Sequence, residues 1–159
     1  MAASTTKKAV VQRFDKETLS GYVHPSSYLQ LTGIELLSEQ GNVALVPYQE
    51  IKTISFVREF ESATDTRRVF NTRPKMEGLW MSFRFRDGEL MEGVMPNNLL
   101  QLEPYGFTII PPDPYSNQQR IFIPKLALDA VEVLGVVGSP LKKRKPKIAS
   151  KEQIGLFEE

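Results

Sequence analysis

The chain has 159 residues, of which 41% are hydrophobic and 25% are charged, as is usual for a globular protein. It has no cysteine and a single histidine, which excludes disulfides, thiolate nucleophiles and zinc sites built from several cysteine or histidine ligands. No apolar run reaches the roughly 18 residues that cross a bilayer, and residues 1–8 carry no secretory signal, so we expect a soluble, cytoplasmic protein without membrane contact.

The formal net charge is +1, but the charge is unevenly distributed. Residues 139–159 hold six basic and three acidic side chains, so this stretch is net positive and the remainder is mildly acidic. A mildly acidic folded part lacks the basic surface of a dedicated nucleic-acid-binding domain. We expect 139–159 to form a flexible basic tail, which could hold phosphate groups without reading sequence. Its densest basic run is Lys142, Lys143, Arg144 and Lys145.

After a flexible N-terminus, 1–8, a first small β unit is predicted over residues 9–57. Its strands are bounded by turn residues such as Gly41-Asn42, and the last of them is rich in β-branched side chains. Between the fourth and fifth strands, a short polar stretch has the length of one helical or 3₁₀ turn. We expect later strands at 33–37, 43–46 and 53–57, with the short turn at 48–52.

A linker of mixed charge is predicted over residues 58–78. Such a segment is usually a solvated connector. An alternative is that Arg67 and Arg68 face the phosphate of a nucleotide second messenger, because paired arginines recur in receptors for cyclic dinucleotides. The full motif of the PilZ receptors is missing from the chain.

A second β unit is predicted over residues 79–138. Met81, Phe83 and Phe85 alternate with more polar residues, the period of a half-buried strand. Asp87-Gly88 follows and predicts a hairpin with a type I′ turn. In the returning strand, Gly93 is expected to form a bulge or tight bend, as is Gly21 in the first unit.

The two units resemble each other in sequence. Residues 47–57 align with 124–134 without a gap, with proline on proline and apolar residues at the same four later positions. Upstream, Arg13-Phe14 aligns with Arg84-Phe85, and the glycines of the second strands follow with a one-residue offset. Four strands, a short turn and a fifth strand are the element order of SH3-like and Sm-like barrels. We therefore predict an all-β fold of tandem duplicated five-stranded barrels, either separate or sharing a sheet.

The segment 111–120 of the second unit is an insertion relative to the first. Its prolines stiffen it, and Asp113 with Ser116 or Asn117 can bond neighbouring backbone amides, while Arg120 can pair with Asp113 or hold loop carbonyls. The same groups could bind an anion or a peptide. The candidate ligand or partner loop is therefore Asp113, Ser116, Asn117 and Arg120, and the candidate anion contacts are Arg67, Arg68, Lys142, Lys143, Arg144 and Lys145.

Two resemblances accompany these motifs. The D-P-x-S-N segment from Asp113, the R-F-x-D-G-E-x-x-x-G hairpin from Arg84 to Gly93 and the strand end at 56–58 resemble an uncharacterised bacterial family over residues 9–136. This resemblance implies a bacterial origin and a small β architecture, and it implies no activity. The strand order also resembles Sm-like RNA-binding barrels, but the loops 24–27 and 96–98 lack the aspartate that those proteins use to read RNA.

No catalytic motif is present, neither a Walker A loop, G-x-G-x-x-G, G-x-S-x-G nor H-E-x-x-H. We therefore expect a non-enzymatic binding or scaffold module without cofactor or metal, which recognises a protein partner or peptide, or its own copies, through exposed strand edges or the 111–120 loop. Two alternatives remain: a nucleic-acid-associated protein that uses the basic tail, or a sensor of a nucleotide second messenger.

Overall fold

A computed structural model describes residues 6–60, 68–113 and 117–138 of the chain. This part consists of antiparallel strands and short 3₁₀ turns, without an α-helix. In chain order the elements are β1 (Lys7–Arg13), β2 (Thr18–Val23), β3 (Gly33–Leu37), β4 (Val43–Pro47), η1 (Tyr48–Glu50), β5 (Ile51–Val57), β6 (Gly78–Phe85), β7 (Leu90–Met95), η2 (Leu99–Gln101), β8 (Gly106–Ile109), β9 (Gln118–Pro124), η3 (Lys125–Ala127) and β10 (Leu128–Val137).

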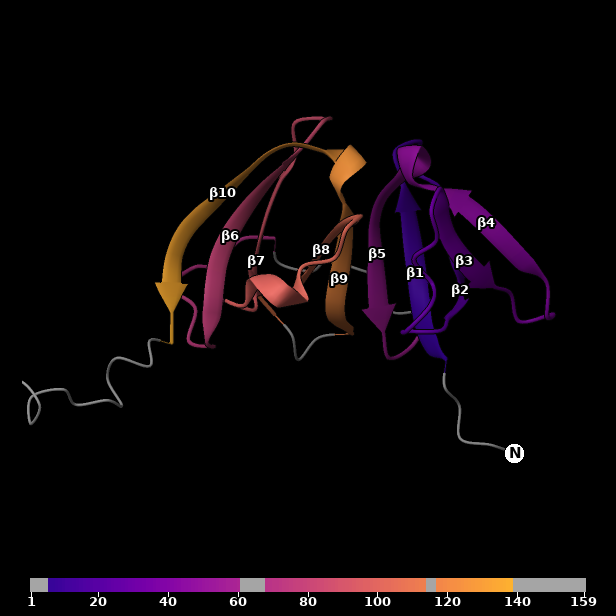
Figure 1. Cartoon of the computed structure of the whole chain (residues 1–159), viewed down its shortest axis with the longest axis horizontal. Coiled ribbons are helices and arrows are strands. Elements are labelled where there is room, and N and C mark those ends of the chain that lie inside the picture. The colour runs from indigo at the N-terminus through magenta and orange to yellow at the C-terminus, as the bar shows by residue number, and fades with distance from the viewer. Residues whose placement is uncertain (1–5, 61–67, 114–116, 139–159) are drawn as a thin grey trace, which may run out of the picture.

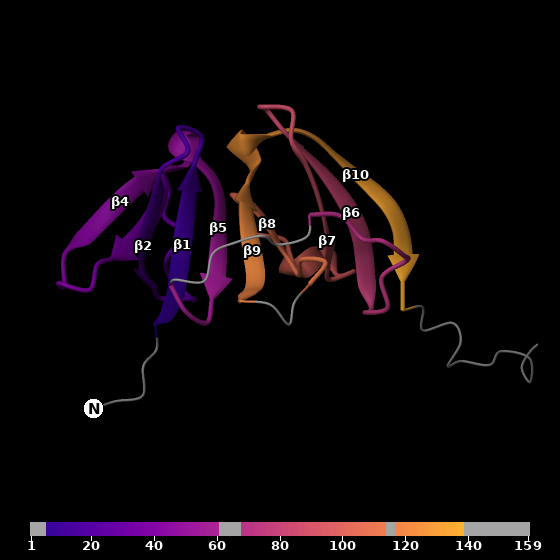
Figure 2. The ribbon, with the colours of Figure 1, turned by 180° about the vertical axis from the view of Figure 1, so that it is seen from behind.

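The strands form one sheet of seven strands, ordered β4-β3-β2-β1-β5-β9-β8, and one of three, ordered β10-β6-β7. Only an isolated bridge, between Val94 and Ile110, links β7 to the strand region after β8. The all-β class is therefore confirmed, and the strand pairings of the described residues leave both sheets open. Strands β4 and β10 lie at opposite ends of the molecule, as Figures 1 and 2 show from its two sides.

Both halves of the chain have four strands, a 3₁₀ turn and a fifth strand in that order, and the second half has a further 3₁₀ turn, η2, between β7 and β8. We call them the first repeat (β1–β5) and the second repeat (β6–β10). The polar stretches after the shared prolines form the predicted turns, η1 and η3. The repeats share a sheet and are not separate, because β5 of the first repeat pairs with β9 of the second.

The first hairpins correct the alignment of the two repeats by one residue. Asp15 accepts a bond from the Glu17 amide at 2.9 Å, and Asp87 accepts one from the Glu89 amide at 3.0 Å, so these two aspartates are counterparts. The strand registers agree, since Ala9 faces Gly21 as Met81 faces Gly93. Arg13 therefore corresponds to Phe85, and the glycines align without the expected offset.

The Asp87-Gly88 hairpin is present, but its turn is not type I′. That type needs positive φ at both central residues, and Lys16 is the sole non-glycine residue of the described part with positive φ. The Gly88 amide donates to the Phe85 carbonyl and the Phe85 amide to the Glu89 carbonyl, with Gly88 at φ 95°. This is a three-residue loop that ends in a left-handed residue, and Lys16, at φ 74°, takes the same place in the first repeat.

Gly21 and Gly93 do not form bulges, because the strand pairs that contain them show no register shift. They allow a close approach instead. A Cβ at Gly21 would lie 2.7 Å from the Leu37 carbonyl oxygen, and one at Gly93 would lie 2.3 Å from Cδ1 of Ile109. The missing side chain thus lets β3 approach Gly21 of β2, and Ile109 of β8 approach Gly93 of β7, more closely than a residue with a Cβ would permit.

Strand β9 lies between the two hydrophobic cores and contributes to both. Its Phe122 is fully buried in the core of the first repeat, where its ring lies edge-on to Tyr28 at 6.0 Å. Its neighbours Ile121 and Ile123 point the other way, into the core of the second repeat. Because alternate residues of a strand face opposite sides, one strand can join two cores, and the repeats share an apolar interior through β9.

Polar and aromatic contacts strengthen the same boundary. The Arg86 guanidinium donates to the Gln49 carbonyl at 2.7 Å and to the Leu126 carbonyl at 2.9 Å, while it lies 3.9 Å from the centre of the Phe14 ring. Lys52 of β5 pairs with Asp87 and with Glu89 of the second repeat. These contacts give the two repeats a fixed relative position.

Candidate functional site

Strand β4 is the outer edge of the seven-stranded sheet and is apolar. Its sequence, from Val43 to Pro47, contains no charged residue. On its surface Val43 is 65% exposed and Leu45 is 52% exposed. Natural proteins usually protect such an edge with charges, bulges or a covering segment, and a bare apolar edge is a site for pairing with another strand.

Strand β10 is the corresponding edge of the three-stranded sheet. Three large apolar side chains near its end, Val133, Leu134 and Val136, are 57%, 42% and 46% exposed. On its inner side β10 is paired with β6 along its length. Among the described residues no strand pairs with its outer side.

The repeat alignment shows what these edges lack. Leu45 of β4 corresponds to Phe122 of β9, and Phe122 is fully buried. Leu134 of β10 corresponds to Val57 of β5, which is also buried. Inside the chain, β5 and β9 cover each other, whereas β4 and β10 have the same apolar pattern and no covering strand. The ungapped match of residues 47–57 to 124–134 shows in the sequence that β5 and β10 have similar apolar residues. The sequence could not show which of these strands another strand covers.

The 111–120 loop has a clear contact with the first repeat through Asn117. The Asn117 side-chain oxygen accepts bonds from the Arg58 and Glu59 amides at 3.0 and 2.8 Å, and its amide group donates to the Glu59 carbonyl at 2.8 Å. Asn117 thus fastens the loop to the end of β5. Ser116 lies outside the described residues.

The other two residues predicted in this loop line different hollows. Asp113 lies beside the linker in a hollow of about 660 Å³ that also includes Arg73 and Lys75. Arg120 is exposed on β9 and lines two hollows, one on each side of the 103–108 segment. The structure therefore does not gather Asp113 and Arg120 into a single hollow.

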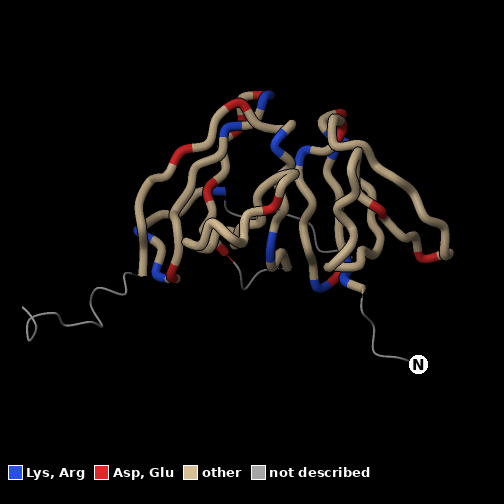
Figure 3. Tube along the Cα trace, viewed as in Figure 1, with Lys and Arg blue, Asp and Glu red and all other residues tan. Residues whose placement is uncertain are grey.

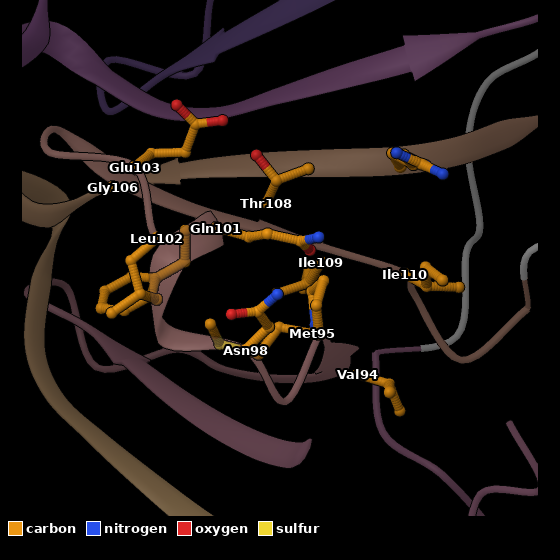
Figure 4. A pocket seen from close by; sticks show the side chains of 13 residues that line it. Val94, Met95, Asn98, Gln101, Leu102, Glu103, Gly106, Thr108, Ile109 and Ile110 are labelled. Atoms are coloured by element: carbon orange, nitrogen blue, oxygen red, sulfur yellow. The ribbon is translucent and has the colours of Figure 1, made fainter. Parts of the chain in front are cut away.

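The first of the hollows at Arg120 has a volume of about 280 Å³ and lies where β7 and β8 diverge. Figure 4 shows Met95 and Ile109 beside the amide side chains of Asn98 and Gln101, with Leu102 nearby. Leu99 and Leu100 of the adjoining η2 are 75% and 95% exposed. The hollow is mainly apolar with a few amide groups, a lining that suits a side chain of a peptide.

The second hollow lies at the boundary of the repeats and measures about 520 Å³. Lys7, Glu103 and Arg120 are its charged residues, and Tyr28 lies in its wall. Burial raises the pKa of the Tyr28 hydroxyl well above its ordinary value, and the nearby Glu103 carboxylate adds to the effect. Tyr28 therefore stays protonated at neutral pH and is a packing and hydrogen-bonding residue here, without the properties of a base.

Of the candidate anion contacts, Arg68 alone lies within the described residues. Arg68 Nη1 lies 3.7 Å from Glu89 Oε1. The cleft around them is lined by side chains of both signs, the basic Arg13, Lys16, Lys52 and Arg68 and the acidic Glu17, Asp87 and Glu89. Arg67 and the basic run Lys142 to Lys145 lie outside the described residues. Figure 3 shows charges of both signs on both repeats.

Within the described ranges, no group of three or more histidine, cysteine, aspartate or glutamate side chains could hold a metal ion. In the same part of the chain, no helix is long and apolar enough to cross a membrane. The described surface has outer strands without a strand partner on one side, one mainly apolar hollow and several hollows with charged residues in their walls.

The chain is thus an all-β protein of two similar repeats joined through a shared sheet. It belongs to the family described as a family of unknown function (DUF6982), whose profile matches residues 5–135. The match includes both repeats and ends within β10. No curated protein and no solved structure matches the chain.

Proposed function

We propose that this protein is a non-enzymatic interaction or scaffold module, which binds an extended segment of a polypeptide along the open edges of β4 and β10. The observation that carries the proposal is the presence of exposed apolar side chains on β4 and β10, two outer strands of the sheets. We further propose that each repeat is a divergent SH3-like or Sm-like barrel, on the grounds of its element order.

An added strand would gain from both the backbone and the side chains. It would satisfy the free amide and carbonyl groups of the edge, which supplies affinity with little dependence on sequence. It would also cover side chains such as Leu45 and Val133, which are about half exposed, and each of these would contribute about 1 kcal/mol. Alternating apolar residues in the ligand would match this surface.

A displayed library of short random peptides tests the proposal with the full chain as bait. We expect the selected peptides to alternate apolar and polar residues and to lose binding when both edges are charged, in a Leu45→Lys, Val133→Lys variant. Leu90→Lys is the matched control, because Leu90 is 53% exposed and lies on β7, the other outer strand of the three-stranded sheet, whose edge the proposal does not use. Peptides that bind the edge variant as well as the wild type would refute the proposal.

A further inference from the structure

The interface inside the chain indicates which strand fits the open edges. We propose that β10 of one copy pairs with β4 of a second copy, in the arrangement that β5 and β9 have within one chain. This inference rests on the proposed function, since it takes the edges to be binding sites, and it names their partner as another copy of the chain.

The neighbours of each strand identify the side on which it has no strand partner in the described part of the chain. Strand β5 pairs with β1 on one side and with β9 on the other. Its counterpart β10 pairs with β6, the counterpart of β1. Within the described ranges no other strand pairs with β10, and the Arg73 guanidinium donates to its Val136 carbonyl at 2.6 Å. Strand β9 pairs with β8 and β5, whereas its counterpart β4 has β3 as its one partner among the strands that the structure describes. The two open sides are therefore the same sides that join the repeats internally.

The internal pairing also predicts the register between copies. In the internal sheet Ile54 faces Phe122, and Phe56 faces Arg120. The shared prolines align Val131 with Ile54 and Leu45 with Phe122, so we expect Val131 of one copy to face Leu45 of the next. By the same alignment, Ala44 faces Glu132 and Val43 faces Val133. The pairing is antiparallel, as it is inside the chain.

Side-chain burial agrees with this placement. In β9, Phe122 enters the core of the repeat with which it pairs, whereas Ile123 stays in the core of its own repeat. In β4, Val46, the counterpart of Ile123, is already buried in the core of its own repeat. Leu45, the counterpart of Phe122, is exposed, and in the proposed contact it would enter the core of a second copy.

The contact between copies would be weaker than the contact within the chain. The internal boundary has the Asn117 bonds to Arg58 and Glu59, and a bond from Gln118 to Ser55 Oγ at 3.2 Å. The counterpart of Ser55 is Glu132, a charged residue that must keep its carboxylate in water. We therefore expect reversible assembly that depends on protein concentration.

The symmetry of such a contact follows from its geometry. Two different edges meet, so a pair of copies keeps one free β4 and one free β10, and these two strands lie at opposite ends of each copy (Figure 1). Such a head-to-tail contact repeats until the rotation between copies closes a ring, or it continues as a filament. A closed two-fold dimer that uses one edge twice is not the arrangement we propose.

Disulfide cross-linking tests the register directly, because the natural chain has no cysteine. In a full-length Val43→Cys, Val133→Cys variant, the two positions should face each other across the contact, with Cα atoms about 5 Å apart, within the range that a disulfide spans. We expect oxidation to yield covalent dimers and larger species on denaturing gels. The control is Leu45→Cys, Val133→Cys, which is two residues out of register, about 8 Å between Cα atoms, and should cross-link at least tenfold less.

Analytical ultracentrifugation supplies a test without cysteines. The wild type should increase in mass with concentration, Leu45→Lys should remain monomeric, and Leu90→Lys should behave like the wild type. A wild type that stays monomeric, or equal cross-linking in the two cysteine variants, would overturn the inference. If library peptides nevertheless bind the edges, the proposed function stands and only the second-copy partner is wrong.

Discussion

The two repeats have the same order of strands and differ in what covers their fourth and fifth strands. In the middle of the molecule β5 and β9 lie against each other, and their apolar side chains are buried. At its two ends β4 and β10 carry a similar apolar pattern on the surface. Burial of a strand thus depends on its neighbour as much as on its own residues. Two copies of a similar sequence can therefore have their apolar side chains buried in one place and exposed in another.

A second difference lies in the first hairpins. Both loops end in a left-handed residue, which is Gly88 in the second repeat and Lys16 in the first. Glycine adopts this conformation without steric cost, whereas lysine does not. The first repeat therefore keeps the turn geometry despite a less suitable residue, which means that the surrounding strand pairing imposes it.

The largest expected effect separates Phe122 from its counterpart Leu45. Phe122→Ala should lower the free energy of unfolding by about 3–5 kcal/mol, because it opens a cavity where the fully buried ring fills the core. Leu45→Ala should change it by less than about 0.5 kcal/mol in dilute solution, where the edge is free. Urea denaturation at low protein concentration measures both values. Similar losses for the two variants would mean that the edge of β4 is covered within the single chain.

The next effect concerns the bonds between the 111–120 loop and the end of β5. Asn117→Ala removes three hydrogen bonds to the Arg58 and Glu59 backbone and should cost about 1–2 kcal/mol of unfolding free energy. Gln40 is the counterpart of Asn117 when the shared prolines Pro47 and Pro124 are aligned. Its side chain is exposed, and Gln40→Ala should leave the unfolding free energy nearly unchanged. Thermal denaturation of the two variants compares them. Equal melting temperatures would show that Asn117 contributes nothing to the boundary.

The hairpin difference predicts two shifts of opposite sign. Gly88→Ala should destabilise the protein by about 1 kcal/mol, because alanine is strained at positive φ. Lys16→Gly should stabilise it by up to about 1 kcal/mol for the converse reason, less the added flexibility of the unfolded chain. Chemical denaturation detects both. A loss of stability in Lys16→Gly would show that the lysine side chain has a role that outweighs the strain of its backbone.

Much of the fold could be predicted from the sequence because strand alternation and turn residues are local signals. The all-β class, the duplicated element order and the short turns at η1 and η3 follow from such signals. The hairpin alignment was wrong by one residue, because Lys16 stands where glycine is expected and hides the match to Gly88.

The partners of the candidate loop residues could not be predicted in the same way. Asn117 bonds to residues nearly sixty positions earlier in the chain, and a contact of that separation leaves no local pattern. Leu45 and Val133 were likewise missed, since an apolar residue in a strand is expected to be buried. Their exposure depends on the absence of a neighbouring strand, which becomes visible only in the assembled sheet.

The smallest expected effect is a pH dependence at the boundary of the repeats. A hydrogen bond from Lys52 lowers the pKa of the Asp87 carboxyl below its ordinary value of 3.8, and the Glu89 amide adds to this shift. Because the pKa is lower in the folded state, the stabilisation is complete above about pH 4–5 and is lost as the pH falls through the folded pKa. Asp87 is 41% exposed, so solvent screening limits the effect to less than about 1 kcal/mol.

Asp87→Asn should reduce the pH dependence of the unfolding free energy between about pH 5 and 2, as measured by urea denaturation across that range. Lys52→Met should reduce it similarly, since it removes the main cause of the lowered pKa of Asp87. If the pH dependence of Lys52→Met equals that of the wild type, the Glu89 amide is the cause of the shift instead.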